Sequence, residues 1–229
     1  MNLRTEKLDL RFGPTAALDE VDLAIPAGDH LLVLGNAASG KTTLLKALAG
    51  LCRPTAGAVR WDGDDVYALR PDDRRARQAG FGMVFQTDAL FDSLPVLGNV
   101  LLPLTNRGVP RAEALTRARD VLGEVGLADA ADRFPERLSG GMRRRAGIAR
   151  AIVARPSVLL ADDPLAGLDP HTGLGVARLL LEVSRGRTLV VCATEPPPGL
   201  ALRRWVWVER GRVTYDGPPD ARVLERGAA

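Results

Sequence analysis

The stretch LLVLGNAASGKTTLLKALAGL, residues 31–51, decides the fold of this chain. It opens with a continuous apolar run that is typical of a fully buried strand. A glycine-containing loop follows, and after it the apolar residues recur at helical spacing. The sequence therefore predicts a strand, a loop and a helix in immediate succession. A simple turn from strand to helix, with no bound ligand, is the alternative interpretation.

The loop GNAASGKT, residues 35–42, fits the pattern G-x-x-x-x-G-K-[ST]. In such a loop, successive backbone N–H groups and the helix N-terminus surround an anionic phosphate. Lys41 would reach the terminal phosphates and Thr42 would offer its hydroxyl to Mg²⁺. Ala38 stands where such loops often have glycine, which narrows the backbone dihedrals available there. The loop predicts binding of a nucleotide with Mg²⁺.

A second motif, LLADDP at residues 159–164, supplies the acidic half of such a site. An apolar strand would carry Asp162 to the carboxyl end of the sheet, where ligands bind in open α/β folds. Asp162 could then hold the Mg²⁺ that bridges the β- and γ-phosphates. The alternative is an acidic pair that only caps a strand.

The bulk composition fits one large globular domain, or a core domain that carries an insertion. The 229 residues are 46% hydrophobic and 26% charged. The formal net charge is +3, but arginines and acids are interspersed, so we expect a mixed solvated surface and no nucleic acid partner. No stretch approaches the roughly 18 apolar residues of a membrane span, and the N-terminus lacks an apolar signal region. Cys52 and Cys192 lack metal-ligand spacing and are expected to be free, buried thiols.

Strand and helix signals alternate along the chain, which predicts a mainly parallel sheet covered on both faces. From about residue 87 to residue 155 the composition is helical and rich in Arg and Ala, and Ser139 is placed to cap a helix there. This helical block would interrupt the sheet as an inserted subdomain. The segment GFGMVFQ is expected to be a strand that ends near Gln86.

Four motifs together resemble the nucleotide-binding subunit of ABC transporters over essentially the whole chain. They are LSGGM at 138–142, Gln86 after GMVF, LLADDP, and LAGLDP at 165–170. The resemblance implies a P-loop NTPase of the α/β class, with a RecA-like, mainly parallel sheet, an antiparallel β subdomain and an inserted α-helical subdomain. One domain would span 1–229, with the core at about 1–86 and 156–229 and the helices at about 87–155. The segments 82–104 and 138–152 look most like the ATPase of the Mla lipid-trafficking system and related MCE-linked transporters, whose signature also has methionine as its fifth residue.

The resemblance also implies a head-to-tail dimer that encloses two ATP molecules with Mg²⁺. Phe12 would stack on adenine, although a core aromatic is the alternative at that position. The implied nucleotide contacts are Phe12, Gly35, Asn36, Ala37, Ala38, Ser39, Gly40, Lys41, Thr42 and Thr43, with Ser139, Gly140 and Gly141 approaching the γ-phosphate held by the other subunit. The implied metal ligands are Thr42, Gln86 and Asp162. The implied catalytic residues are Lys41, Gln86, Asp163 and Glu195.

The partners implied are a second nucleotide-binding subunit, either another copy of this chain or a related one, and an integral membrane permease. The permease would contact the region after Gln86. This would place the chain peripherally on the cytoplasmic face of the inner membrane. The cargo and the direction of transport belong to the permease.

Two residues depart from the family pattern. Asp163 stands where the family has the glutamate that polarises the attacking water, and its carboxylate is set back by about 1 Å, which could cost ~10²-fold in rate. Glu195 stands where the family has a histidine near the γ-phosphate, so that donor is lost. Three interpretations follow: a degenerate subunit that closes on ATP, an Asp163 that suffices at a reduced rate, or a Glu195 that partly replaces the missing glutamate.

Three functions follow from these observations. The first is an ATP-hydrolysing subunit that powers a transporter, with phospholipid or another hydrophobic cargo. The second is a degenerate subunit that binds ATP and dimerises but hydrolyses poorly. The third is a soluble ABC ATPase that acts on DNA or ribosomes, which the short helical insertion and the lack of a second cassette disfavour.

Overall fold

The computed structural model describes residues 1–225 and contains two β-sheets. The smaller sheet is antiparallel, with the strand order β2-β1-β4-β5. The larger sheet has the order β10-β9-β3-β8-β7-β6; its strands run parallel except β10, which is antiparallel to β9. The strands are β1 (Leu3–Phe12), β2 (Thr15–Ile25), β3 (His30–Leu34), β4 (Ala56–Trp61), β5 (Asp64–Asp65), β6 (Phe81–Val84), β7 (Val158–Asp162), β8 (Thr188–Ala193), β9 (Arg204–Glu209) and β10 (Arg212–Gly217).

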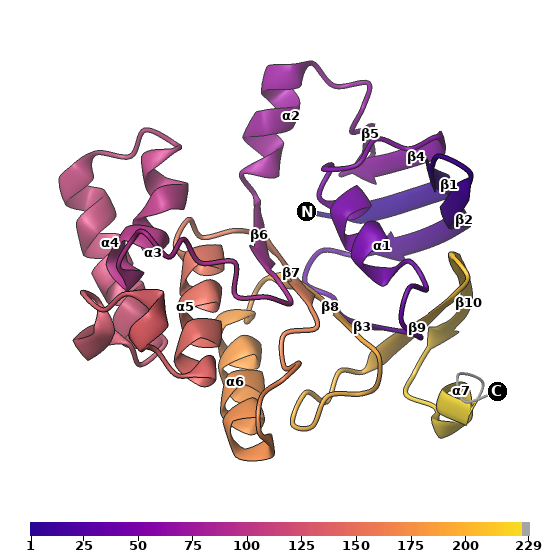
Figure 1. Cartoon of the computed structure of the whole chain (residues 1–229). Coiled ribbons are helices and arrows are strands. Elements are labelled where there is room, and N and C mark those ends of the chain that lie inside the picture. The colour runs from indigo at the N-terminus through magenta and orange to yellow at the C-terminus, as the bar shows by residue number, and fades with distance from the viewer. Residues whose placement is uncertain (226–229) are drawn as a thin grey trace.

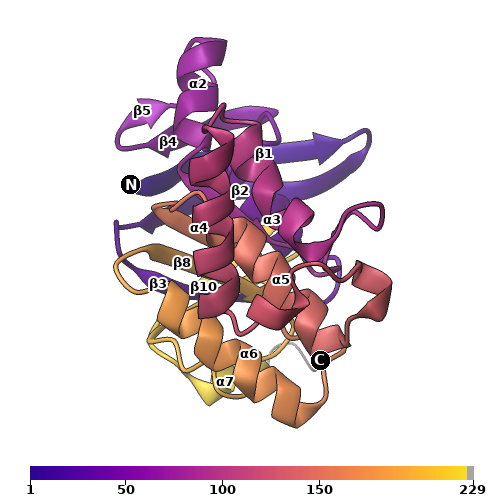
Figure 2. The same ribbon diagram turned by 90° about the vertical axis from the view of Figure 1, so that its left-hand side faces the viewer.

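Helices cover both faces of the larger sheet. Figure 1 shows α3, α4 and α5 grouped beyond β6, at the opposite side of the molecule from the antiparallel sheet, and in the turned view of Figure 2 α3 and α4 lie in front of that sheet. Helix α1 follows β3 directly, and α6 follows β7. The helices are α1 (Lys41–Leu48), α2 (Pro71–Gln78), α3 (Val96–Thr105), α4 (Arg111–Glu124), α5 (Gly140–Ile152), α6 (Pro170–Val183) and α7 (Ala221–Glu225), with short 3₁₀ turns at Ala128–Ala130 and Pro135–Arg137.

The larger sheet separates two hydrophobic cores, because successive side chains of a strand point to opposite faces. On β3, Leu31 and Val33 enter a core shared with α1 and the antiparallel sheet. Leu32 and Leu34 enter the other core, which is shared with α3, α4, α5 and α6. Strands β7 and β8 likewise contribute alternate side chains to each of the two cores. Burial on both faces explains why these strands are apolar without interruption.

The predicted α/β class, with its mainly parallel sheet, antiparallel sheet and helical block, is confirmed. The limits of the helical subdomain near residues 87 and 155 stay a prediction. Strand β6 ends at Val84, so Gln86 lies in the following loop and not at the end of the strand. Helix α2 was not predicted. It begins with Pro71 and has no buried residue, so it lacks the apolar repeat that would reveal a helix.

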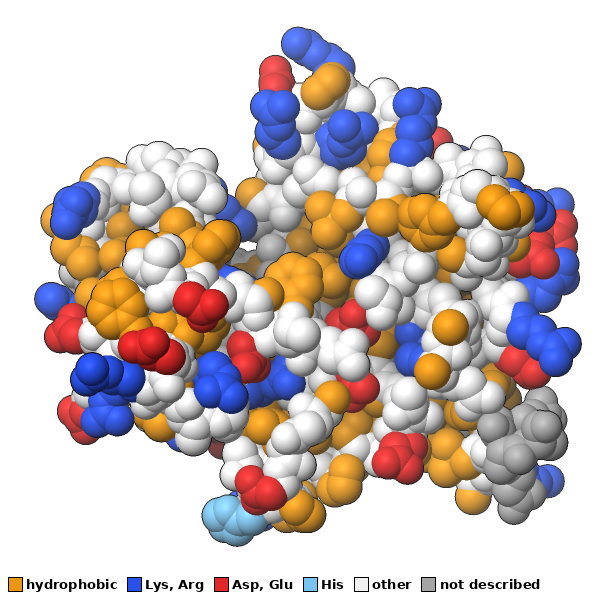
Figure 3. Space-filling model, viewed as in Figure 1, with side chains coloured by type: hydrophobic (Ala, Val, Ile, Leu, Met, Phe, Trp, Pro, Cys, Tyr) orange, Lys and Arg blue, Asp and Glu red, His pale blue; other side chains and the backbone are white. Residues whose placement is uncertain are grey.

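The surface carries both charge signs side by side, as Figure 3 shows for one face. Arg212 pairs with Asp19 at 2.8 Å, and Arg204 pairs with Asp216 at 2.6 Å and with Asp29 at 2.7 Å. Of the helices in residues 1–225, none has the length and apolarity needed to cross a bilayer. In the same residues Cys52 and Cys192 are free thiols, and Cys192 is fully buried whereas Cys52 is half-buried.

Candidate nucleotide site

The loop between β3 and α1 requires glycine at its two ends. Gly35 has φ 153°, and a Cβ there would lie 2.1 Å from the Val208 carbonyl oxygen. Gly40 has φ 109°, and its Cβ would lie 2.4 Å from the Ala17 carbonyl oxygen. Both positions therefore combine a left-handed backbone with a close approach of neighbouring main chain. Glycine at these two positions therefore lets the loop pack against the main chain of β9 and β2.

Ala38 and Lys41 complete the loop. Ala38 has φ 59°, in the left-handed region that glycine adopts more easily, so the departure noted in the sequence has a structural consequence. The Lys41 ammonium donates to the carbonyl oxygens of Gly35 and Asn36, both at 2.7 Å. Burial lowers the pKa of Lys41, while the charges of Cys192, Asp163 and Asp162 act in the opposite direction. Lys41 thus lies folded back over the loop.

Asp163, Glu195 and the loop all follow the carboxyl-terminal ends of strands in the larger sheet. In the parallel pairing, Leu34 of β3 is opposite Ala193 of β8, and Asp162 of β7 is opposite Cys192. The segments that follow these strands therefore start side by side. Val84 of β6 is opposite Ala161, which brings the loop with Gln86 to the same end of the sheet. The sheet register thus gathers four groups of predicted site residues.

Asp163 occupies a strained and partly desolvated position. Its φ is 43°, a conformation that Asp and Asn adopt more readily than most residues. Its N–H donates to the Cys192 carbonyl oxygen at 2.8 Å, which fixes the backbone against β8. Burial raises the pKa of Asp163, the charges of Asp162 and Glu195 raise it further, and Lys41 and Arg144 oppose the rise. The Asp163 carboxylate thus shares its electrostatic environment with Lys41 of the loop and with Glu195.

Phe12 lies at the end of β1 and is 57% exposed, so it is not a core aromatic. It pairs with Thr15 of β2, and residues 15–17 line a cavity together with residues 38–43 of the loop. The cavity contains the loop hydroxyls of Thr42 and Thr43. Phe12 is therefore the strand partner of a residue that lines the cavity beside the loop.

Ser139 is the N-cap of α5, as predicted, and its hydroxyl accepts from the Met142 N–H at 3.3 Å. Helix α5 belongs to the core on one face of the sheet, whereas α1 belongs to the core on the other face. The structure therefore does not bring Ser139, Gly140 and Gly141 onto the loop of the same chain. Glu195 lies two residues after the end of β8, and residues 194–203 contain no helix, as the three prolines of that turn predict.

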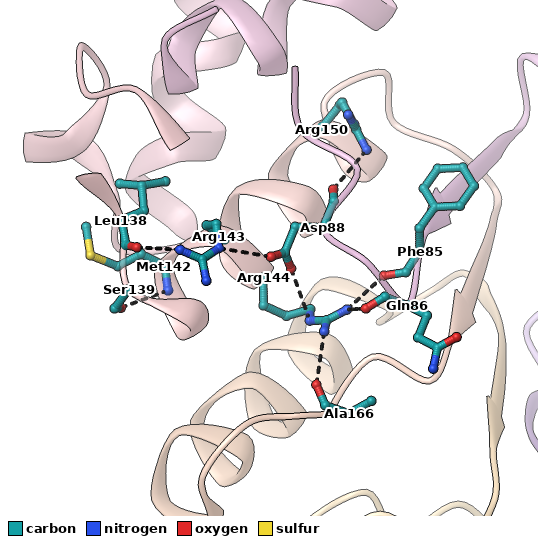
Figure 4. Close-up of polar contacts among 10 residues, drawn as sticks. All are labelled: Phe85, Gln86, Asp88, Leu138, Ser139, Met142, Arg143, Arg144, Arg150 and Ala166. Atoms are coloured by element: carbon teal, nitrogen blue, oxygen red, sulfur yellow. Dashed lines mark hydrogen bonds and ion pairs between the residues drawn. The ribbon is translucent and has the colours of Figure 1, made fainter. Parts of the chain in front are cut away.

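Sequence reasoning missed the arginines of α5 that hold the loop after β6. Arg144 is only 5% exposed and donates to the carbonyl oxygens of Phe85 and Gln86 at 2.8 and 2.7 Å (Figure 4). In the sequence these arginines resemble a solvated helix face, since nothing marks which of them is buried. The available signal was Asp88, two residues after Gln86, because an acid in this loop can pair with arginines of the helical block.

The residues present suit a nucleotide and a divalent cation. Residues 38–43 of the loop line a cavity, and Asp162 is a buried carboxylate at the end of β7. A hydroxyl on Thr42, an amide on Gln86 and a carboxylate on Asp162 are oxygen donors of the kind that Mg²⁺ prefers. These features define a nucleotide-binding protein with a phosphate-binding loop.

Comparison with known proteins narrows this class: residues 18–166 match the family described as ABC transporter, and the chain belongs to that family. It is 39% identical over 211 residues to the methionine import ATP-binding protein MetN of Rhizobium etli, and 42% identical over 205 residues to MetN of Myxococcus xanthus. These alignments cover 90% and 88% of this chain but only 58% and 62% of the relatives. The cofactors of the family are ATP and Mg²⁺.

Solved cassettes have the same fold. The dimeric post-hydrolysis ATP-binding cassette MJ0796, bound to ADP and Pi, matches with a TM-score of 0.83 and 30% identity, covering 94% of this chain and 98% of that one. CbiO1 from Clostridium perfringens matches with a TM-score of 0.85 and 27% identity, covering 99% and 92%.

The expected likeness to the Mla and MCE-linked lipid ATPases is not supported, because the curated relatives are methionine import ATPases. That expectation rested on the segments 82–104 and 138–152, of which Met142 is one residue. In the structure Met142 is half-buried and packs against the hydrophobic core. Its identity therefore reports the packing of α5 and not the cargo.

Proposed function

We propose that this chain is an ATP-hydrolysing subunit that powers a membrane ABC transporter. The observation that carries this proposal is that the Lys41 loop, Asp162, Asp163 and Gln86 all lie at the carboxyl-terminal ends of the parallel strands. An acid beside a phosphate loop, held next to a metal-binding carboxylate, is the arrangement that phosphoryl transfer to water requires.

Each of these residues has a role that follows from its position. The loop N–H groups and Lys41 hold the phosphates, and Thr42, Asp162 and Gln86 hold Mg²⁺. Asp163 accepts a hydrogen bond from the attacking water and orients it toward the γ-phosphorus. ATP with Mg²⁺ supplies the electrophilic phosphoryl group. Ser139, Gly140 and Gly141 of a second cassette present the N-terminus of α5 to the same phosphate.

A second function, ATP-driven closure with poor hydrolysis, is favoured by one specific observation. Burial raises the pKa of Asp163, and the charge of Glu195 adds to the rise. Ionisation of Asp163 therefore costs more than ionisation of an exposed Asp, and its carboxylate is also one methylene shorter than that of glutamate. The chain would then dimerise on ATP while a related cassette performs most of the turnover.

The partners we propose are a second cassette and an integral membrane permease. Leu51, Phe85 and Phe91 are exposed apolar side chains, and Phe85 and Phe91 lie in the loop between β6 and α3. Burial of such side chains against a partner would be favourable. The permease would hold the chain peripherally on the cytoplasmic face of the cell membrane.

The cargo we propose is methionine or a closely similar amino acid, in place of a lipid. Support comes from relatives named as methionine importers, which are about 40% identical over most of the chain.

Uptake of labelled methionine by cells that lack this chain provides the test. Uptake should return with the wild-type chain and should not return with Lys41→Ala, while uptake of labelled phospholipid stays unchanged. Restored phospholipid movement without restored methionine uptake would overturn the proposed cargo. Equal restoration by Lys41→Ala would overturn the proposed use of ATP.

A further inference from the structure

One buried guanidinium joins three segments of the chain. Arg144 of α5 donates to the Phe85 and Gln86 carbonyl oxygens and, at 3.2 Å, to the Ala166 carbonyl oxygen (Figure 4). Phe85 and Gln86 belong to the loop after β6, and Ala166 belongs to the loop between β7 and α6. Each of the three segments carries residues of the candidate site.

Asp88 extends this connection to the start of α5. Its carboxylate lies 3.4 Å from Arg144 Nε and 3.3 Å from Arg143 Nε. Arg143 also donates to the Leu138 carbonyl oxygen at 2.7 Å, directly before Ser139. Within residues 1–225, Asp88 is the single carboxylate within 4 Å of either arginine. Removing it would leave a buried cation without its counter-ion, which is costly.

The planar guanidinium explains why arginine fits this position. Its donors diverge in a fixed fork, so one side chain can serve carbonyl groups on two separate loops at once. A lysine would keep the charge but has a single nitrogen and cannot reproduce these directions. Arg150, six residues further along α5, donates to the carbonyl oxygens of Asp88, at 3.2 Å, and Ala89. The loop of residues 85–89 is therefore attached to α5 over its whole length.

The Gln86 side chain is not part of this network. In Figure 4 it points away from Arg144, while its backbone carbonyl faces the guanidinium. The arginine therefore fixes the backbone of the loop and leaves the amide available for the site.

We propose that Arg144, held by Asp88, is a positioning residue that sets the loop of Gln86 and the loop of Asp163 in one fixed arrangement on α5. A shift of α5 would then move the water-orienting acid and Gln86 together. The expected effect on turnover rests on the proposed function. The arrangement itself is a property of the folded chain and does not depend on that function.

Amide hydrogen exchange of the full chain tests the arrangement without any turnover. Arg144→Lys should speed exchange in residues 85–91 and in residues 163–169 together, while residues 35–43 stay unchanged. Arg178→Lys, the same replacement at an exposed position of α6, should change none of these segments. Unchanged exchange in either loop, or an equal rise in residues 35–43, would overturn the proposal.

Asp88→Asn provides a second variant of nearly unchanged shape in case Arg144→Lys does not fold. It should raise exchange in the same two loops by a smaller factor. A rise confined to residues 85–91 would mean that Asp88 only anchors its own loop, and this too would overturn the proposal.

Phosphate release then tests the effect on the site. Arg144→Lys should lower kcat about tenfold in the wild-type background but no more than about threefold in a Gln86→Ala background, with KM for ATP within about twofold. Equal factors in both backgrounds would mean that Arg144 acts independently of Gln86 and would contradict the proposal. If wild type releases no more phosphate than Lys41→Ala, the proposed function fails, and the exchange experiment alone decides the role of Arg144.

Discussion

Asp163 is the residue at which stability and activity conflict. A carboxylate must be ionised to orient water, yet burial raises the pKa of Asp163 and so disfavours that form in the folded chain. A folded-state pKa above the unfolded value adds stability below the unfolded pKa, and this contribution is lost as pH rises through the folded pKa. At neutral pH the ionised Asp163 therefore lowers the free energy of unfolding.

Asp163→Asn should raise the melting temperature at pH 7 and abolish most hydrolysis, by about 10²-fold or more. Asparagine tolerates the left-handed backbone at this position, so no new strain is introduced. The gain in melting temperature should shrink as pH falls through the raised pKa of Asp163, and it should be nearly gone at the unfolded pKa of Asp, near 4. Thermal unfolding of both proteins from pH 4 to pH 8 measures it. A lower melting temperature for Asp163→Asn at pH 7 would show that the carboxylate is stabilised by its cations and not destabilised by burial.

Glu195→Gln should shift the acidic limb of the activity profile toward lower pH. The negative charge of Glu195 contributes to the raised pKa of Asp163, so its removal lets Asp163 ionise at a lower pH. At pH 7 or above, phosphate release should stay within about threefold of wild type. A loss of more than about tenfold there would instead make Glu195 a catalytic acid in its own right. Initial rates from pH 5 to pH 9 distinguish the two.

At the scale of elements, helix α5 packs closely on α6 near their N-termini. A Cβ at Gly141 would lie 2.4 Å from Thr172 Cγ2, a β-branched group with little freedom to move. At Gly140 the nearest atom would be Leu168 Cδ2 at 3.6 Å, an ordinary contact.

Gly141→Ala should therefore lower the free energy of unfolding by roughly 1–3 kcal/mol, whereas Gly140→Ala should change it by less than about 0.5 kcal/mol. Adding Thr172→Ser to Gly141→Ala should recover most of the loss, since it removes the clashing methyl group. Chemical denaturation of the four proteins provides the measurement. Equal effects at Gly140 and Gly141 would mean that backbone preference, and not contact with α6, sets the cost.

The sequence predicted those elements whose pattern has a direct physical cause. The strand, loop and helix at 31–51 were predicted because burial on both faces makes β3 apolar and because only glycine fits the ends of the loop. Helix α2 was missed because none of its side chains is buried. The left-handed backbone of Asp163 and the burial of Arg144 have no local signal, since both depend on contacts with distant segments.

At the scale of the whole molecule, the larger sheet places the loop and Ser139 on separate sides. Helix α1 packs in one core and α5 in the other, so one chain cannot enclose a phosphate between them. We therefore predict that Asp163→Asn is monomeric without nucleotide and forms dimers with ATP and Mg²⁺, because slow hydrolysis preserves the closed state.

Sedimentation velocity with ATP, with ADP and without nucleotide measures this dimerisation. Asp163→Asn combined with Lys41→Ala serves as the control and should stay monomeric throughout. Equal amounts of dimer in all three conditions would show that dimerisation does not depend on ATP and would contradict the prediction.

Steady-state phosphate release from the purified protein beside Lys41→Ala shows whether this chain itself hydrolyses ATP. Wild-type turnover should lie well above that of Lys41→Ala, and Asp163→Glu, which returns the carboxylate to full length, should raise it further by up to ~10²-fold. Wild-type turnover equal to that of Lys41→Ala, restored only by the Asp163→Glu/Glu195→His double replacement, would contradict hydrolysis by this chain. It would show that ATP closes a dimer here while another chain hydrolyses it.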